Sequence, residues 1–216
     1  MIKNRVDKIE QITATIKTKI LEINERYRTG PDLYFYKRLN HLRNNSNSIE
    51  SFLRNDYHIE ILYATLMSWD MNSRRAKMKY FDEFKANILS CLNTFKKLET
   101  FEKSGDTDLI RLVSTLRNTY ENLNLMKTSG KLVSNSKLLH FLFPRLLMPM
   151  DRENTLSYFY GNTGESLNKY IEIIGFSFEI MNRSENWNNY LDDKWNTTVP
   201  KIIDNAIILL VGKSVK

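Results

Sequence analysis

The sequence has little cysteine, glycine or proline: one, seven and four residues, respectively, among 216. A single cysteine excludes an internal disulfide framework and any zinc site built from several cysteines. Scarce glycine and proline argue against a turn-rich β fold and against long flexible linkers. No apolar run reaches the roughly 20 residues that a membrane helix requires, and the charged start MIKNRVDKIE lacks the apolar core of a secretory signal. We therefore expect a cytoplasmic, monomeric protein with no membrane contact.

The positive net charge is the feature of the composition that bears most directly on the class of binding partner. Lysine and arginine number 32 against 25 aspartates and glutamates, which gives a net charge of +7 and a pI near 9.3. Basic residues gather in the stretches 36–43, 72–79 and 131–145 rather than in one tail. Such local concentration is typical of nucleic-acid binding, although it also occurs simply for solubility. Charge alone therefore leaves nucleic-acid binding and solubility as about equally favoured explanations. If the partner is double-stranded DNA, Arg74 and Arg75 in the stretch 72–79 are candidate phosphate contacts.

Apolar residues recur at the spacing of amphipathic helices along the whole chain, and no convincing strand pair is visible. The pattern predicts an all-α fold, a compact bilobal helical unit spanning residues 1–216, with lobes at about 1–127 and 128–216 as a conceivable division. The expected helices occupy 5–28, 32–43, 49–54, 56–71, 79–101, 107–126, 136–143, 151–161, 165–182 and 199–211.

The stretch 128–160 is the most informative part of the sequence. A turn at 133–136 is expected to lead into a short helix through Lys137, and backbone N–H groups at such a turn can bind a phosphate. After two prolines the chain reaches Asp151 at the start of the next helix, a position that keeps a carboxylate ionised. An ionised carboxylate on rigid backbone can stabilise a developing cation or activate water. The alternative is a simple helix cap that contributes about 1 kcal/mol.

This stretch resembles the core of the helix-hairpin-helix DNA glycosylase superfamily. In that family a hairpin of the type L-P-G-V-G-x-K-T-A opens a helix, and a P-V-D segment later starts the next one. Here LVSNSKLL at 132–139 matches the hairpin, with serines in place of its glycines, and MPMD at 148–151 matches the second segment. The resemblance implies that Asp151 is the catalytic carboxylate and that the backbone of Ser134, Asn135 and Ser136 grips a DNA phosphate. Lys137 falls where bifunctional members keep their Schiff-base lysine.

The resemblance also implies a reaction. The enzyme would flip a damaged or modified base out of the duplex and break its N-glycosidic bond. Asp151 would stabilise the oxocarbenium ion and activate water, without a cofactor or metal. Lys137 would either attack the sugar or contact a phosphate, and Arg145 and Arg152 flank the carboxylate in the sequence. The excised base stays open, and a hypermodified pyrimidine of the kind found in phages is one hypothesis, alongside the ordinary lesions of DNA repair.

A flipped base requires stacking partners, which are often aromatic. The candidates are Trp69, Tyr63 and Tyr158, with Tyr34 and Tyr36 also considered; His140 could reach the same site because it follows Lys137 by three residues. For all of them a place in the apolar core is the competing interpretation.

Two other classes of function stay open. The run Arg54-Asn55-Asp56-Tyr57-His58 resembles the R-N…H core of the small all-α ribonucleases known as HEPN domains, with Arg54 and His58 as the catalytic pair. The third class is a non-catalytic helical DNA-binding protein in which Asp151 only caps a helix. A P-loop and an H-E-x-x-H zinc motif are both missing from the sequence.

Overall fold

A computed structural model describes residues 2–27, 29–71, 77–105, 108–183 and 186–212. The described chain is helical and contains no named strand, which confirms the all-α prediction. The longer helices are α1 Arg5–Lys19, α3 Pro31–Asn44, α5 Asp56–Leu66, α6 Phe81–Ser90, α7 Leu92–Ser104, α8 Leu109–Asn122, α9 Leu132–Leu142, α11 Leu167–Met181 and α12 Val199–Val211. Shorter pieces are α2 Ile23–Arg26, α4 Ile49–Leu53, α10 Ser157–Tyr160 and the helical turns η1 Ile20–Glu22, η2 Met67–Met71, η3 Arg152–Leu156 and η4 Trp187–Tyr190.

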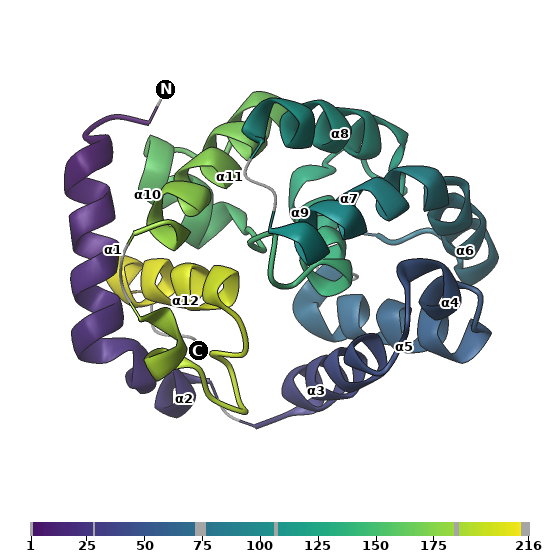
Figure 1. Ribbon diagram of the computed structural model, residues 1–216, viewed down its shortest axis with the longest axis horizontal. Helices are drawn as coiled ribbons and strands as arrows, with labels where there is room; N and C mark the ends of the chain where they lie inside the picture. Colours follow the sequence, from purple (N-terminus) through teal and green to yellow (C-terminus); the bar gives the residue numbers. More distant parts are fainter. Residues whose placement is uncertain (1, 28, 72–76, 106–107, 184–185, 213–216) are drawn as a thin grey trace.

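The two ends of the described chain lie side by side, because α1 packs along α12 (Figure 1). Helices α3 to α7 form the opposite side of the molecule, and α9 lies between the two sides. It contacts α3 and α5 on one side and α11 on the other. Helices from 1–127 and from 128–216 thus pack directly against each other.

The contact between α1 and α12 follows from their apolar patterns. Ile9, Ile12 and Ile16 recur at helical spacing and are fully buried, whereas Val6, one turn before Ile9, is 62% exposed. Residues 200–208 of α12 are all buried. The rest of the protein therefore covers this part of α12 on all sides, and α12 forms the centre of its side of the molecule.

The helix expected over 79–101 is interrupted. Helix α6 ends at Ser90 and α7 starts at Leu92, with Cys91 between them at φ −88° and ψ 2°. The apolar residues Phe84, Ile88 and Phe95 stay buried across this break. Periodicity therefore identified the buried face correctly and missed the bend, since no glycine or proline marks it.

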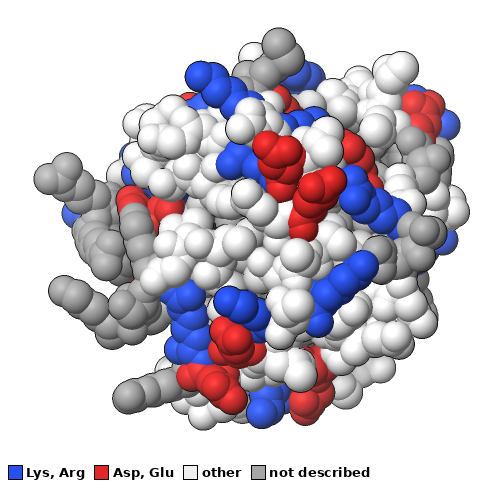
Figure 2. All heavy atoms as spheres, turned by 90° about the vertical axis from the view of Figure 1, so that its left-hand side faces the viewer, with Lys and Arg blue, Asp and Glu red and all other residues white. Residues whose placement is uncertain are grey.

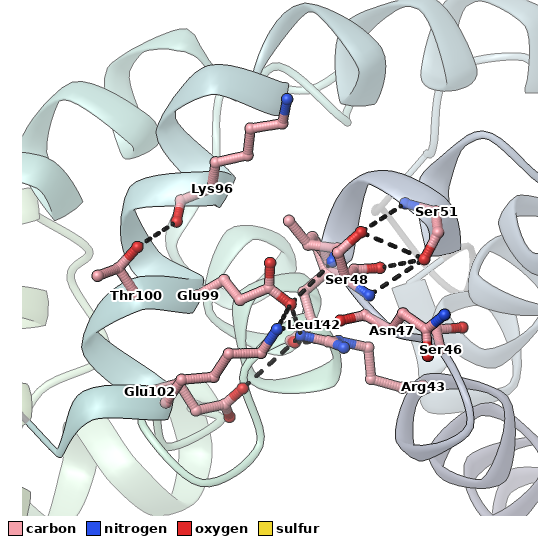
Figure 3. Close-up of polar contacts among 12 residues, drawn as sticks. Arg43, Ser46, Asn47, Ser48, Ser51, Lys96, Glu99, Thr100, Glu102 and Leu142 are labelled. Atoms are coloured by element: carbon pink, nitrogen blue, oxygen red, sulfur yellow. Dashed lines mark hydrogen bonds and ion pairs between the residues drawn. The ribbon is translucent and has the colours of Figure 1, made fainter.

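Buried ion pairs fix α3, α4 and α7 to one another (Figure 3). Arg43 of α3 lies 3.1 Å from Glu99 and 3.8 Å from Glu102, both on α7. Its Nε also donates to the carbonyl of Leu142 at 2.9 Å. Glu99 accepts the backbone N–H of Ile49 at the start of α4 at 2.8 Å. One guanidinium therefore faces two carboxylates in the interior.

Glu102 is expected to lower stability at neutral pH. Burial raises its pKa, against the opposing effects of the Arg145 backbone N–H and of Arg43. A raised pKa means that the folded protein holds the proton more tightly than the unfolded chain does. Stability is therefore greatest below the pKa of the unfolded chain and falls as the pH rises through the folded value. Glu102→Gln should unfold at equal or higher denaturant concentration at pH 7 and flatten the loss of stability above pH ~4.5, measured by urea titrations. A lower midpoint at pH 7 would contradict this.

The positive net charge is not gathered on the α1 side of the molecule. Figure 2 shows that face, where basic and acidic side chains are interspersed. Within the described ranges, no helix has both the length and the apolar character needed to cross a bilayer.

Candidate functional site

The candidate site is centred on Trp69 in the helical turn η2. The chain leaves α5 there through an irregular backbone: Trp69 has φ −91° and ψ 33°, and Asp70 has φ +64°. Positive φ is uncommon for a residue other than glycine and often accompanies functional sites. The indole Nε1 donates to the carbonyl of Asp32 at 3.3 Å, and the ring contacts Phe141 with a centroid separation of 4.9 Å. Trp69 is held from several sides and stays half-buried.

Lys137 of α9 is bound to this turn. Its Nζ donates to the carbonyl of Trp69 at 2.7 Å and lies 5.7 Å from the centre of the indole ring. Burial lowers the pKa of Lys137 to about 8, although the charges of Asp151, Asp204 and Asp70 act in the opposite direction. On the order of a tenth of such amines is neutral at pH 7. A neutral amine is a nucleophile, so the environment allows this lysine to react.

Ser136 explains how Lys137 and Asp151 come together. Its hydroxyl accepts the backbone N–H of Met150 at 3.2 Å and lies 3.4 Å from the Met150 carbonyl, and its side chain is fully buried. The residues next to this junction are Lys137 on α9 and Asp151 on the extended segment. Asp151 then caps η3, with Oδ1 accepting the backbone N–H of Asn154 and Oδ2 accepting its side-chain amide at 2.8 Å. The prediction that Asp151 starts a helix is confirmed.

A second pair of charges also lies close to Trp69. Lys201 of α12 places its ammonium 5.2 Å from the indole centre and donates to Asp204 at 2.6 Å and to Asn205 at 2.8 Å. Burial raises the pKa of Asp204, and the neighbouring Asp151 acts in the same direction, against Lys201. Sequence reasoning missed these residues. Polar side chains at 201, 204 and 205 of an otherwise apolar helix share one face, and that spacing could have found them.

His140, predicted as a candidate base contact, lies in the interior within a chain of hydrogen bonds. It is fully buried, and its Nδ1 lies 2.8 Å from the carbonyl of Leu147. A carbonyl only accepts, so Nδ1 carries the proton and Nε2 accepts from the Tyr36 hydroxyl at 3.0 Å. Burial lowers the pKa of His140 to about 3, which keeps it neutral. The Tyr36 hydroxyl also lies 2.7 Å from that of Thr197. These hydrogen bonds hold Tyr36 in place, and the Tyr36 ring packs against the indole of Trp69.

The turn expected at 133–136 is wrong, because α9 already begins at Leu132. The backbone N–H of Asn135 donates to the Lys131 carbonyl within this first helical turn. Ser134, Asn135 and Ser136 are all buried, and the Asn135 amide donates toward the carbonyls of Tyr120 and Leu123. The hairpin geometry that would expose these backbone amides to a phosphate is therefore not formed. Short polar side chains are typical of turns, but here they form hydrogen bonds to backbone carbonyls from within a helix.

Two arginines expected beside Asp151 have separate surroundings. Arg145 lies beyond the C-terminal end of α9, where its backbone N–H donates to Glu102 of α7 at 2.9 Å. Arg152 follows Asp151 directly and pairs with Glu165 at 2.5 Å. Glu165 also accepts the backbone N–H of Leu132 at 2.9 Å. Arg74 and Arg75 lie outside the described residues.

Two of the expected base contacts serve other parts of the fold. Tyr63 donates to the carbonyl of Lys79 at 2.9 Å and packs edge-on against Phe84. Tyr158 donates to Gln11 of α1 at 3.0 Å. The structure therefore groups Trp69 with Lys137, and it does not bring Tyr63 or Tyr158 to them.

Arg54 and His58, the pair of the ribonuclease hypothesis, have local partners. Arg54 pairs with Glu50 at 2.8 Å, one turn earlier. The His58 ring stacks on Phe52, and its Nδ1 lies 3.1 Å from the Phe52 carbonyl. These contacts stabilise the junction of α4 and α5 and favour no catalytic geometry.

Comparison with protein-family models, curated proteins and solved structures yields no match to this chain.

Proposed function

We propose that this protein is a DNA glycosylase that cleaves the N-glycosidic bond of a flipped, damaged or modified base. The observation that supports the proposal is the junction at Ser136, which sets Lys137 and the helix-capping carboxylate of Asp151 on adjacent backbone. Lys137 has a lowered pKa and is bound to the half-buried Trp69. This arrangement meets the chemical needs of base excision. The resemblance of 148–151 to the P-V-D segment points to the same reaction.

In the hydrolytic route the bond between sugar C1′ and the base nitrogen breaks, and its electron pair leaves with the base. Asp151 stabilises the positive charge that develops on the sugar. A water held by the carboxylate then attacks C1′ and transfers its proton to Asp151 or to solvent. Asn154 orients the carboxylate through both of its oxygens, so the charge is fixed in place before the substrate binds. Trp69 offers an aromatic face to the extruded base.

Borohydride trapping should separate the two roles of Lys137. If the neutral amine attacks C1′, it displaces the base and forms an imine that borohydride reduces to a stable protein–DNA adduct. Because the pKa of Lys137 is about 8, the yield of adduct should rise as the pH rises toward that value and level off above it. Lys137→Gln should give no adduct, and Lys131→Gln, on the same helix start, should keep it. No adduct at any pH would assign Lys137 to phosphate contact.

The direct test of the proposal is the release of free bases. Purified protein is incubated with genomic DNA and with DNA from phages that carry modified bases, and released bases are identified by mass spectrometry. A released base with a matching abasic site supports the proposal. DNA binding without any released base would favour the non-catalytic alternative.

A further inference from the structure

Two segments that are remote in the sequence meet at an isolated antiparallel bridge between Met78 and Met126. The N–H of Lys79 donates to the carbonyl of Leu125 at 2.9 Å, and the N–H of Lys127 donates to the carbonyl of Lys77 at 2.8 Å. We call residues 77–80 and 125–127 the bridge ribbon. Both methionines are buried, so the ribbon is attached to the core through them.

The bridge ribbon gathers positive charge. Its hydrogen bonds place Lys77 opposite Lys127, and both side chains are exposed. The stretches that supply the ribbon, 71–81 and 122–137, contain no aspartate or glutamate. Over the described ranges, no acidic side chain lies within ion-pair distance of Lys77, Lys79 or Lys127. Some surface lysines elsewhere do have an acidic partner, such as Lys37 with Asp193 and Lys85 with Asp56.

Like charges directly opposite each other across a ribbon lower its stability. A bound polyanion would remove this repulsion, because its phosphates would lie between the ammonium groups of Lys77 and Lys127. Lys127 is held in place by Tyr80, because its ammonium lies 3.1 Å from the centre of that ring. Tyr80 is itself 71% exposed. Such a cation–π contact holds the ammonium group of Lys127 against the protein surface.

The two segments of the bridge ribbon are also close in the sequence to the elements of the candidate site. One strand follows η2, which carries Trp69, and the other precedes α9, which carries Lys137. We infer that the bridge ribbon binds the sugar–phosphate backbone of duplex DNA through Lys77, Lys79 and Lys127, next to the site. The inference rests on the proposed function for the identity of the partner. The lysines of the bridge ribbon would then make the phosphate contacts that were predicted for residues 134–136, which are buried.

The test is the salt dependence of binding to a fluorescently labelled DNA duplex of mixed sequence. Each phosphate contact contributes about 0.9 to the slope of log affinity against log salt concentration. The double variant K77Q/K127Q should bind about tenfold or more weakly at low salt, with a slope smaller by roughly 2. The control K19Q/K97Q removes two exposed lysines on α1 and α7 and so changes net charge equally. It should keep both affinity and slope, and circular dichroism checks that each variant is folded.

The outcomes distinguish this inference from the proposed function. Equal losses in both double variants, an unchanged slope in K77Q/K127Q, or no binding by the wild type would overturn the bridge ribbon as the DNA contact. Tighter binding of a matched RNA duplex would overturn DNA as the partner. If K77Q/K127Q binds normally but the wild type still releases bases, only the bridge ribbon is wrong. If the ribbon variant loses affinity and no base is released from any DNA, the glycosylase proposal fails and the DNA contact stands.

Discussion

Asp151→Asn should lower the rate of base release by about 10²–10³-fold, the usual cost of removing one group that stabilises charge in a transition state. Asparagine has nearly the same shape and keeps an oxygen to accept the N–H of Asn154, so the cap is largely preserved. Without the negative charge of Asp151, the cation that forms on the sugar is no longer stabilised. Single-turnover release of the identified base measures the rate, and urea unfolding shows whether the fold is kept.

The matched control for this variant is Glu153→Gln, which removes a carboxylate two residues away on an exposed position of η3. It should leave the rate of base release within about twofold, because Glu153 is exposed to solvent, which screens its charge. Equal rates for Asp151→Asn and the wild type would mean that Asp151 is only a helix cap. The catalytic role proposed for it would then be abandoned.

Arg43→Ala should reduce the free energy of unfolding by about 3–5 kcal/mol, the usual cost of breaking a buried ion pair from one side. The change removes the cation that Glu99 and Glu102 share in the interior, and among the described residues it leaves Glu99 with only the exposed Lys103 as an ion-pair partner (Figure 3). It also removes the hydrogen bond to Leu142 at the end of α9. Chemical denaturation monitored by circular dichroism at pH 7 gives the value.

Arg54→Ala is the matched control, since it breaks an exposed pair with Glu50 on the same side of the molecule. Its expected cost is below about 1 kcal/mol. Adding Glu99→Gln and Glu102→Gln to Arg43→Ala should restore part of the lost stability if buried charge is the cause. A loss in Arg43→Ala no larger than in Arg54→Ala would show that the cluster contributes little.

Most helices could be predicted from the sequence because their apolar residues follow a helical period and their ends carry recognisable signals. Asp151 caps its helix as expected, and Gly105, at φ +63°, ends α7 inside the expected break. The failures have local causes. The polar run Ser134–Ser136 looks like a turn, but its side chains find partners inside the protein. The bend at Cys91 has no glycine or proline to mark it.

The candidate site was only partly predictable, because it depends on contacts between residues far apart in the chain. Lys137 and Asp151 were identified from a local pattern that spans a few turns. The pair of Lys201 with Asp204 comes to Trp69 only through the packing of α12. The bridge ribbon depends on one short pairing between residues separated by the whole of α6, α7 and α8. No periodicity within either segment encodes such a pairing.

The packing of α1 along α12 has a consequence for the order of folding. Lys201 and Asp204 lie on α12, and the main partner of that helix, α1, is far away in the sequence. Contacts between remote segments close a long loop of chain, so they form more slowly than contacts between neighbouring helices. We therefore expect the part of the Trp69 surroundings that α12 supplies to form late in folding.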